Sequence, residues 1–93
     1  MKKISKPEPI EFEIEDCDGN TKILSCKTVT NEMYERISQA FKEDKNVFIV
    51  NREQMAIIFG GSESDYLKFD QRQIKAVLDG FNEIMSGPIQ PQD

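Results

Sequence analysis

The chain of 93 residues is long enough for one hydrophobic core and leaves little room for a second. Hydrophobic residues make up 38% and charged residues 31%, and no apolar run approaches the length of a membrane span, so we expect one soluble domain. The formal net charge of -5, with cations scattered among acids, disfavours direct binding to nucleic acid, because phosphate backbones would be repelled.

Residues 1–9 carry several lysines and two prolines and show no hydrophobic periodicity, which predicts a flexible arm. A secretory signal peptide would follow its basic start with an apolar core, whereas here Glu8 and Pro9 are followed by alternating acids. We therefore expect the protein to stay in the cytoplasm.

The next segment, Ile10–Glu15, alternates strictly between apolar and acidic residues, which is the period of a strand with one buried face. Asp16–Asn20 is rich in turn-forming residues, and 21–27 has the composition of a second strand. The pattern predicts an antiparallel β-hairpin over residues 10–27.

The length of the turn decides which face of the second strand is buried. A three-residue loop over 18–20 places Leu24 and Cys26 on the face that carries the apolar residues of the first strand. A two-residue loop places Ile23 and Ser25 there instead. We favour the three-residue loop.

The two cysteines are too far apart to pair on that register. Cys17 sits beside the turn, and Cys26 lies about 17 Å along the strand from Thr21, at about 3.3 Å per residue. A disulfide needs Cα atoms within about 7 Å, so none is expected. Cys26 is predicted to be a small core residue.

Two helices are predicted in the middle of the chain. Candidate N-caps at 28–31 precede apolar residues at helical spacing, which predicts a helix over 31–43. A cap-like Asn51, with a glycine stop after Phe59, predicts a short helix over 51–59. The β-branched run 47–50 fits either a third strand or the lead into that helix, and periodicity does not decide between them.

The remaining pattern predicts two more helical segments and a tail. Ser62 and the early acids that follow it predict a brief helical turn over 63–68. A second cap pattern at Asp70 and a long apolar stripe predict a helix over 70–86, and 87–93 has two prolines and no periodicity.

A two-stranded hairpin is marginal in water by itself, so its apolar face must lie on the helices. The predicted fold is therefore α+β. One small domain over 10–86 packs an N-terminal antiparallel hairpin on three to four α-helices.

Residue types that carry catalytic chemistry are scarce. The chain has no histidine, the commonest general base at neutral pH, and two separated cysteines cannot supply the four ligands of a structural zinc ion. Asp16 and Asp18 imitate the first ligands of a calcium loop, but Thr21 stands at its glycine position and Lys27 at its bidentate acid position. We predict no enzyme, no metal and no cofactor.

The segment Met55–Phe59 is apolar on every side of its predicted helix, so one side can face the core while the rest needs another cover. That cover is either a partner protein or simply the first and last helices. Two aromatic residues beside the Gly60–Gly61 stop are further candidates for anchors, and they fit the core equally well. The candidate partner-binding residues are Met55, Ile57, Ile58, Phe59, Tyr66 and Phe69.

Three segments, Met55–Gly60, Asp65–Asp70 and Ile74–Ile84, resemble the C-terminal half of tail assembly chaperones of long-tailed phages and prophages. The predicted hairpin and first helix suit the layout of that family, so the resemblance covers most of residues 10–86. It implies a non-enzymatic protein of the bacterial host cytoplasm, absent from the finished virion.

The resemblance also implies the partners. Such a chaperone binds the long tape measure protein and helps the tail tube protein to polymerise around it. In several such phages a programmed frameshift near the end of the gene adds a second domain to part of the product. A homo-oligomer formed through the same apolar surface is a further expectation.

Two rival hypotheses remain. One is a small acidic inhibitor, either a DNA mimic or an antitoxin-like protein, that acts through the carboxylates of the hairpin, although interspersed lysines weaken it. The other is an enzyme that uses carboxylates alone. A solvated strand face that discourages aggregation accounts better for those acids.

Overall fold

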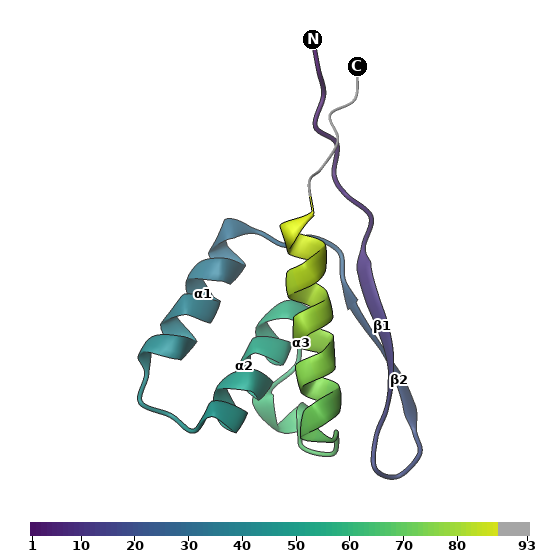
Figure 1. Cartoon of the computed structure of the whole chain (residues 1–93), viewed down its shortest axis with the longest axis vertical. Coiled ribbons are helices and arrows are strands. Elements are labelled where there is room, and N and C mark those ends of the chain that lie inside the picture. The colour runs from purple at the N-terminus through teal and green to yellow at the C-terminus, as the bar shows by residue number, and fades with distance from the viewer. Residues whose placement is uncertain (88–93) are drawn as a thin grey trace.

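The computed structural model describes residues 1–87, and they form a small α+β domain with an N-terminal two-stranded antiparallel hairpin followed by three helices (Figure 1). A short 3₁₀ segment, η1, lies between the last two helices. The elements are β1 Ile10–Glu15, β2 Thr21–Cys26, α1 Asn31–Lys42, α2 Val47–Phe59, η1 Glu63–Tyr66 and α3 Gln71–Ser86.

The hairpin has the predicted buried face but a different register. The loop residues are 17–19, between Asp16 and Asn20, so the predicted loop over 18–20 is displaced by one residue. The reason is Asp16: its N–H donates to the Asn20 carbonyl over 2.9 Å, and its carbonyl accepts from Gly19 over 3.1 Å. Gly19 has a φ of 84°, which glycine adopts without the strain that a Cβ brings.

This displacement moves the register by two residues, so each side chain stays on its predicted face. Ile10 pairs with Cys26, and Leu24 is buried. Both cysteines are free, Cys26 is a core residue as predicted, and Cys17 is exposed in the loop.

The helices form a second layer against the apolar face of the hairpin. α3 lies on β1 and α2 lies on β2, while α1 contacts α2 and no other element of residues 1–87 (Figure 1). The core residues are Ile10, Ile14, Leu24, Cys26, Ile37, Met55, Ile58, Tyr66, Ile74, Val77, Leu78 and Phe81.

The prediction that the second helix begins at residue 51 is wrong. α2 begins at Val47, because the side chain of Asn46 caps it by accepting from the Phe48 N–H over 2.8 Å. The open segment 47–50 is thus the first turn of this helix, and α2 ends at Gly60, whose φ of 92° again suits glycine.

The other helix boundaries differ from prediction by smaller amounts. Thr30 caps α1, which ends one residue early at Lys42. The predicted helix over 63–68 is a single 3₁₀ segment that ends at Tyr66. Asp70 is the N-cap of α3 and stands outside the helix itself.

Residues 1–9 contain no helix and no strand beyond the single bridging residue Lys3, and they project past the domain in Figure 1. The predicted tail over 87–93 lies, apart from Gly87, outside the described residues. No helix between residues 1 and 87 has the length and apolar character needed to cross a membrane.

Candidate functional site

The six predicted partner-binding residues do not form one exposed surface. Met55, Ile58 and Tyr66 are buried in the core, with exposed fractions of 0%, 4% and 1%. The other three are half-buried and pack against the core. Among them, Phe59 packs against Phe12 with the two rings nearly perpendicular and their centroids 6.1 Å apart.

Tyr66 and Phe69 are brought together, with ring centroids 6.2 Å apart. The Tyr66 hydroxyl donates to the carbonyl of Gly60 over 2.6 Å, and Lys22 Nζ lies 5.2 Å from the centre of its ring. Burial, with the charge of Asp65 second, raises the pKa of the phenol. Tyr66 thus joins the end of α2 to β2.

A groove lined by both apolar and polar side chains adjoins this aromatic pair. It has a volume of about 260 Å³ and lies between the start of α2 and the η1–α3 junction. Tyr66 and Ile74 are its buried residues, and exposed Phe48 and Leu67 stand at its rim. We call it the α2–η1 groove; it is lined by Phe48, Arg52, Tyr66, Leu67, Phe69, Gln71 and Ile74.

The polar wall of the groove is a paired cation. Arg52 Nε donates to Glu63 Oε1 over 2.5 Å, with exposed side-chain fractions of 18% and 32%. This ion pair joins α2 to η1. Because Glu63 neutralises the charge of Arg52, the groove carries no net charge. The groove is therefore suited to an apolar side chain and not to an anion.

Sequence reasoning missed the most exposed residues of this region. Val47, Phe48 and Ile49 are 57%, 49% and 36% exposed, and Leu67 is 59% exposed. The signal was present in the apolar run 47–50, because the first turn of a helix can bury only one side of such a run. Only Val50 of this run is buried.

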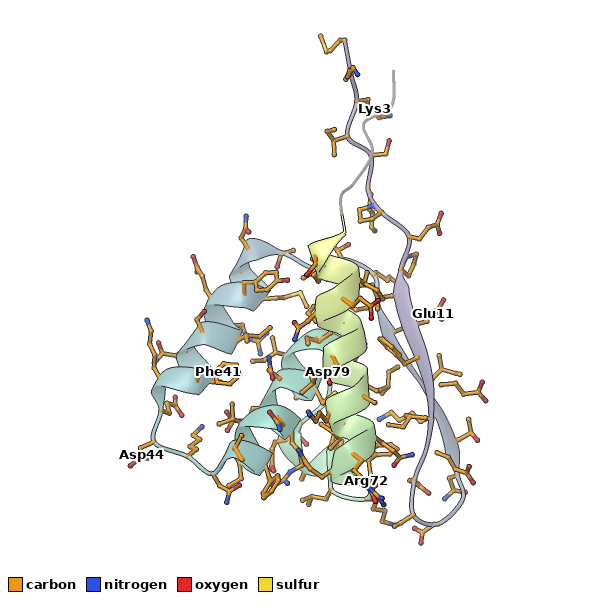
Figure 2. The ribbon with its side chains drawn as sticks, in the orientation of Figure 1. Lys3, Glu11, Phe41, Asp44, Arg72 and Asp79 are labelled. Carbon is orange, nitrogen blue, oxygen red and sulfur yellow. The ribbon has the colours of Figure 1, made fainter. Side chains whose placement is uncertain are left out.

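The outer helix α1 adds a second set of exposed aromatic residues. It buries Ile37 and Ala40, whereas Phe41 is 57% and Tyr34 is 39% exposed. Figure 2 shows Phe41 on the side of α1 that faces the rest of the molecule. The helical layer thus exposes apolar residues at both α1 and the start of α2.

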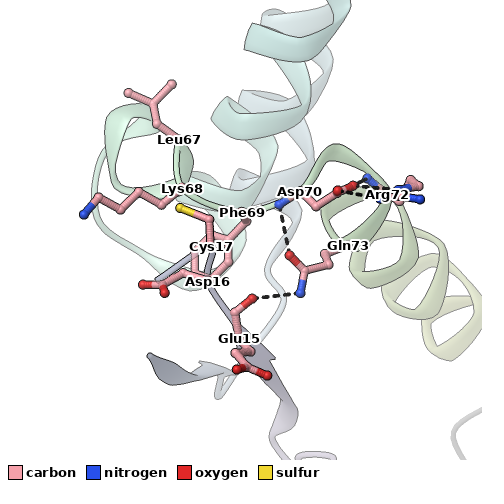
Figure 3. A pocket seen from close by; sticks show the side chains of 9 residues that line it. All are labelled: Glu15, Asp16, Cys17, Leu67, Lys68, Phe69, Asp70, Arg72 and Gln73. Atoms are coloured by element: carbon pink, nitrogen blue, oxygen red, sulfur yellow. Dashed lines mark hydrogen bonds and ion pairs between the residues drawn. The ribbon is translucent and has the colours of Figure 1, made fainter. Parts of the chain in front are cut away.

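A second hollow, of about 610 Å³, lies between the hairpin loop and the start of α3 (Figure 3). Gln73 bridges it: Nε2 donates to the Glu15 carbonyl over 2.8 Å, and Oε1 accepts from the Asp70 N–H over 2.9 Å. The N–H of Cys17 donates to the Lys68 carbonyl over 3.0 Å. These bonds fasten the end of β1 to α3 and the hairpin loop to the connection between η1 and α3.

The carboxylates of this hollow also have structural partners. Arg72, through its side chain first and its backbone N–H second, holds the pKa of Asp70 at about 2. The backbone N–H of Asn20, with that of Asp18, lowers the pKa of Asp16. Both groups are ionised caps at neutral pH, so neither is poised to hold a proton for general acid catalysis.

Over residues 1–87, no three His, Cys, Asp or Glu side chains gather in a way that would hold a metal ion. The α2–η1 groove has a mixed lining, in which aromatic and aliphatic side chains stand beside Gln71 and the paired Arg52. Comparisons of this chain with protein-family models, curated proteins and solved structures found no match.

Proposed function

We propose that this protein is a non-enzymatic phage tail assembly chaperone that binds a helical segment of a tape measure protein and promotes tail tube assembly. The observation that carries the proposal is the α2–η1 groove, with the exposed side chains of Phe48 and Leu67 at its rim. Apolar side chains exposed around one hollow contribute to the kind of contiguous patch that marks contact sites on soluble proteins.

The size of the groove favours a helical ligand. At about 260 Å³ it has room for one or two apolar side chains of a partner. A helix supplies such anchors three or four residues apart. The identity of the client comes from the resemblance of residues 55–84 to tail assembly chaperones.

The acidic-inhibitor hypothesis has less support from the geometry. Glu11, Glu13 and Glu15 form a single exposed row on β1. Their cross-strand neighbours on β2 are the uncharged Ser25, Ile23 and Thr21. A mimic of duplex DNA needs two rows of negative charge, and this hairpin has one.

The test is retention of tagged tape measure and tail tube proteins by wild-type protein and by Phe48→Asp and Leu67→Asp variants. A carboxylate in place of either apolar side chain should weaken binding of the tape measure protein by at least about tenfold. Phe48 is 49% and Leu67 is 59% exposed, so the variants should keep the circular dichroism spectrum of the wild type.

The matched control is Ile84→Asp, because Ile84 is 51% exposed on α3 and does not line the groove. It should bind like the wild type. Wild-type retention by both groove variants would exclude the groove as the binding site. Failure of the wild type to retain either tail protein, together with capture of a nuclease or toxin, would refute the chaperone proposal.

A further inference from the structure

The two edges of the hairpin differ in how well they are protected against pairing with a further strand. On β1, the exposed row Glu11, Glu13 and Glu15 places negative charge beside any added strand. Figure 2 shows Glu11 pointing away from the domain. The main chain at the end of this strand is also occupied, because the Glu15 carbonyl accepts from Gln73 Nε2.

The edge of β2 has neither protection. In an antiparallel pair, hydrogen-bonded and non-hydrogen-bonded residue pairs alternate along the strands. Because Asp16 N–H donates to Asn20 O, the even-numbered residues of β2 are the ones that hydrogen-bond to β1. The N–H and C=O groups of Thr21, Ile23 and Ser25 therefore point outward. No turn, loop or side-chain hydrogen bond within residues 1–87 involves these groups, and all three residues are exposed.

We propose that the β2 edge pairs antiparallel with β2 of a second copy of this chain. A two-fold axis through Ile23 places it opposite the partner's Ile23 and places Thr21 opposite the partner's Ser25. In this register every outward N–H and C=O of the three residues meets its complement, which joins the two hairpins into one four-stranded sheet.

The side chains of β2 favour a copy of itself over an unrelated strand. Thr21, Ile23 and Ser25, whose main-chain groups point outward, read hydroxyl, apolar, hydroxyl, a pattern that is self-complementary under a two-fold axis. Ile23, 57% exposed in one copy, would be covered by its equivalent. β2 carries no acid, and its Lys22 would lie opposite the partner's Leu24, so no like charges meet. Pairing through β1 would oppose glutamates.

The inference is independent of the proposed client, because the β2 edge and the α2–η1 groove lie on different elements. Sedimentation equilibrium of the full chain should show a concentration-dependent dimer. Ile23→Lys places two lysines opposite each other and should raise the dissociation constant roughly 100-fold. The control Glu13→Gln makes the same change in net charge on the neighbouring strand and should leave the dimer intact.

Cross-linking tests the register in a Cys17→Ser background, with the buried Cys26 retained. Ile23→Cys should give a disulfide-linked dimer under mild oxidation, because Cα atoms of such a pair lie about 5.5 Å apart. Thr21→Cys should not, since its equivalents would be about 13 Å apart.

Three results would overturn the proposal. They are a monomer at all concentrations, a dimer that Ile23→Lys does not weaken, and cross-linking by Thr21→Cys but not by Ile23→Cys. Loss of client binding by Ile23→Lys in a strictly monomeric protein would assign this edge to a strand of a different partner.

Discussion

Tyr66 shows how one side chain can join segments that are distant in sequence. Its hydroxyl bonds to Gly60, its ring lies beneath Lys22, and its edge adjoins Phe69. In the sequence, Tyr66 is an aromatic residue close to the glycines that end a helix, and this pattern fits a partner-binding anchor and a core residue equally well. Its exposed fraction of 1% assigns Tyr66 to the core. This burial depends on contacts with β2, which the sequence around Tyr66 does not reveal.

Tyr66→Phe should lower the free energy of unfolding by about 1 kcal/mol, because the Gly60 carbonyl loses its donor while the ring still fills its site. Urea denaturation followed by circular dichroism measures the change. Tyr34→Phe is the control, since Tyr34 is 39% exposed, and it should be neutral. Equal stabilities of wild type and Tyr66→Phe would mean that water replaces the phenol at no cost.

At the scale of elements, the spacing of apolar residues predicts whether a segment is a helix or a strand better than it predicts where the segment begins and ends. The alternation in β1 and the apolar stripe of α3 each follow from which side faces the core, so both were found. The start of α2 was misplaced because Asn46 and Asn51 both have cap chemistry. Asn46 is the cap in the structure, and the longer helix that it starts buries Val50, which is a tertiary contact that the local pattern does not contain.

Gly80 is a second element-level feature that pattern alone did not reveal. A Cβ built at this position in α3 would lie 3.0 Å from the ring of Phe12. Glycine inside a helix costs about 1 kcal/mol relative to alanine. Here its lack of a side chain lets β1 approach α3 closely, which places the hairpin on the helical layer.

The cap of α3 gives the domain a pH dependence. Because the folded-state pKa of Asp70 is about 2, below its ordinary value of about 3.9, its contribution to stability is complete above about pH 5. The contribution is lost as the pH falls through about 2. Asp70→Asn keeps a capping side chain but removes the charge that pairs with Arg72.

We therefore expect the stability gap between wild type and Asp70→Asn to narrow between about pH 5 and about pH 2. Urea midpoints measured across this range give the gap directly. Asp16 and Asp65, whose pKa values are also lowered, are present in both proteins and cancel in the difference. A gap that stays constant with pH would show that the charge of Asp70 contributes nothing to folding.

At the scale of the whole molecule, α2 is the central helix. It contacts α1, η1, α3 and β2, which explains why its sequence is apolar on nearly every side. The period of the sequence could not tell a helix surrounded by its own domain from one that awaits a partner, since both have the same composition. The neighbours of α2 answer this for Met55 and Ile58, which are buried, whereas Val47, Phe48 and Ile49 of its first turn are exposed.

Ile58→Asp tests this central position. Ile58 is 4% exposed, and the polar atoms buried without a partner would cost more than about 4 kcal/mol, which is most of the stability of a small domain. We expect this variant to lose its helical circular dichroism signal at about 25 °C and neutral pH. Ile49→Asp, on the same helix but 36% exposed, should keep that signal. A folded Ile58→Asp protein that fails to bind the tape measure protein would instead place Ile58 in the interface.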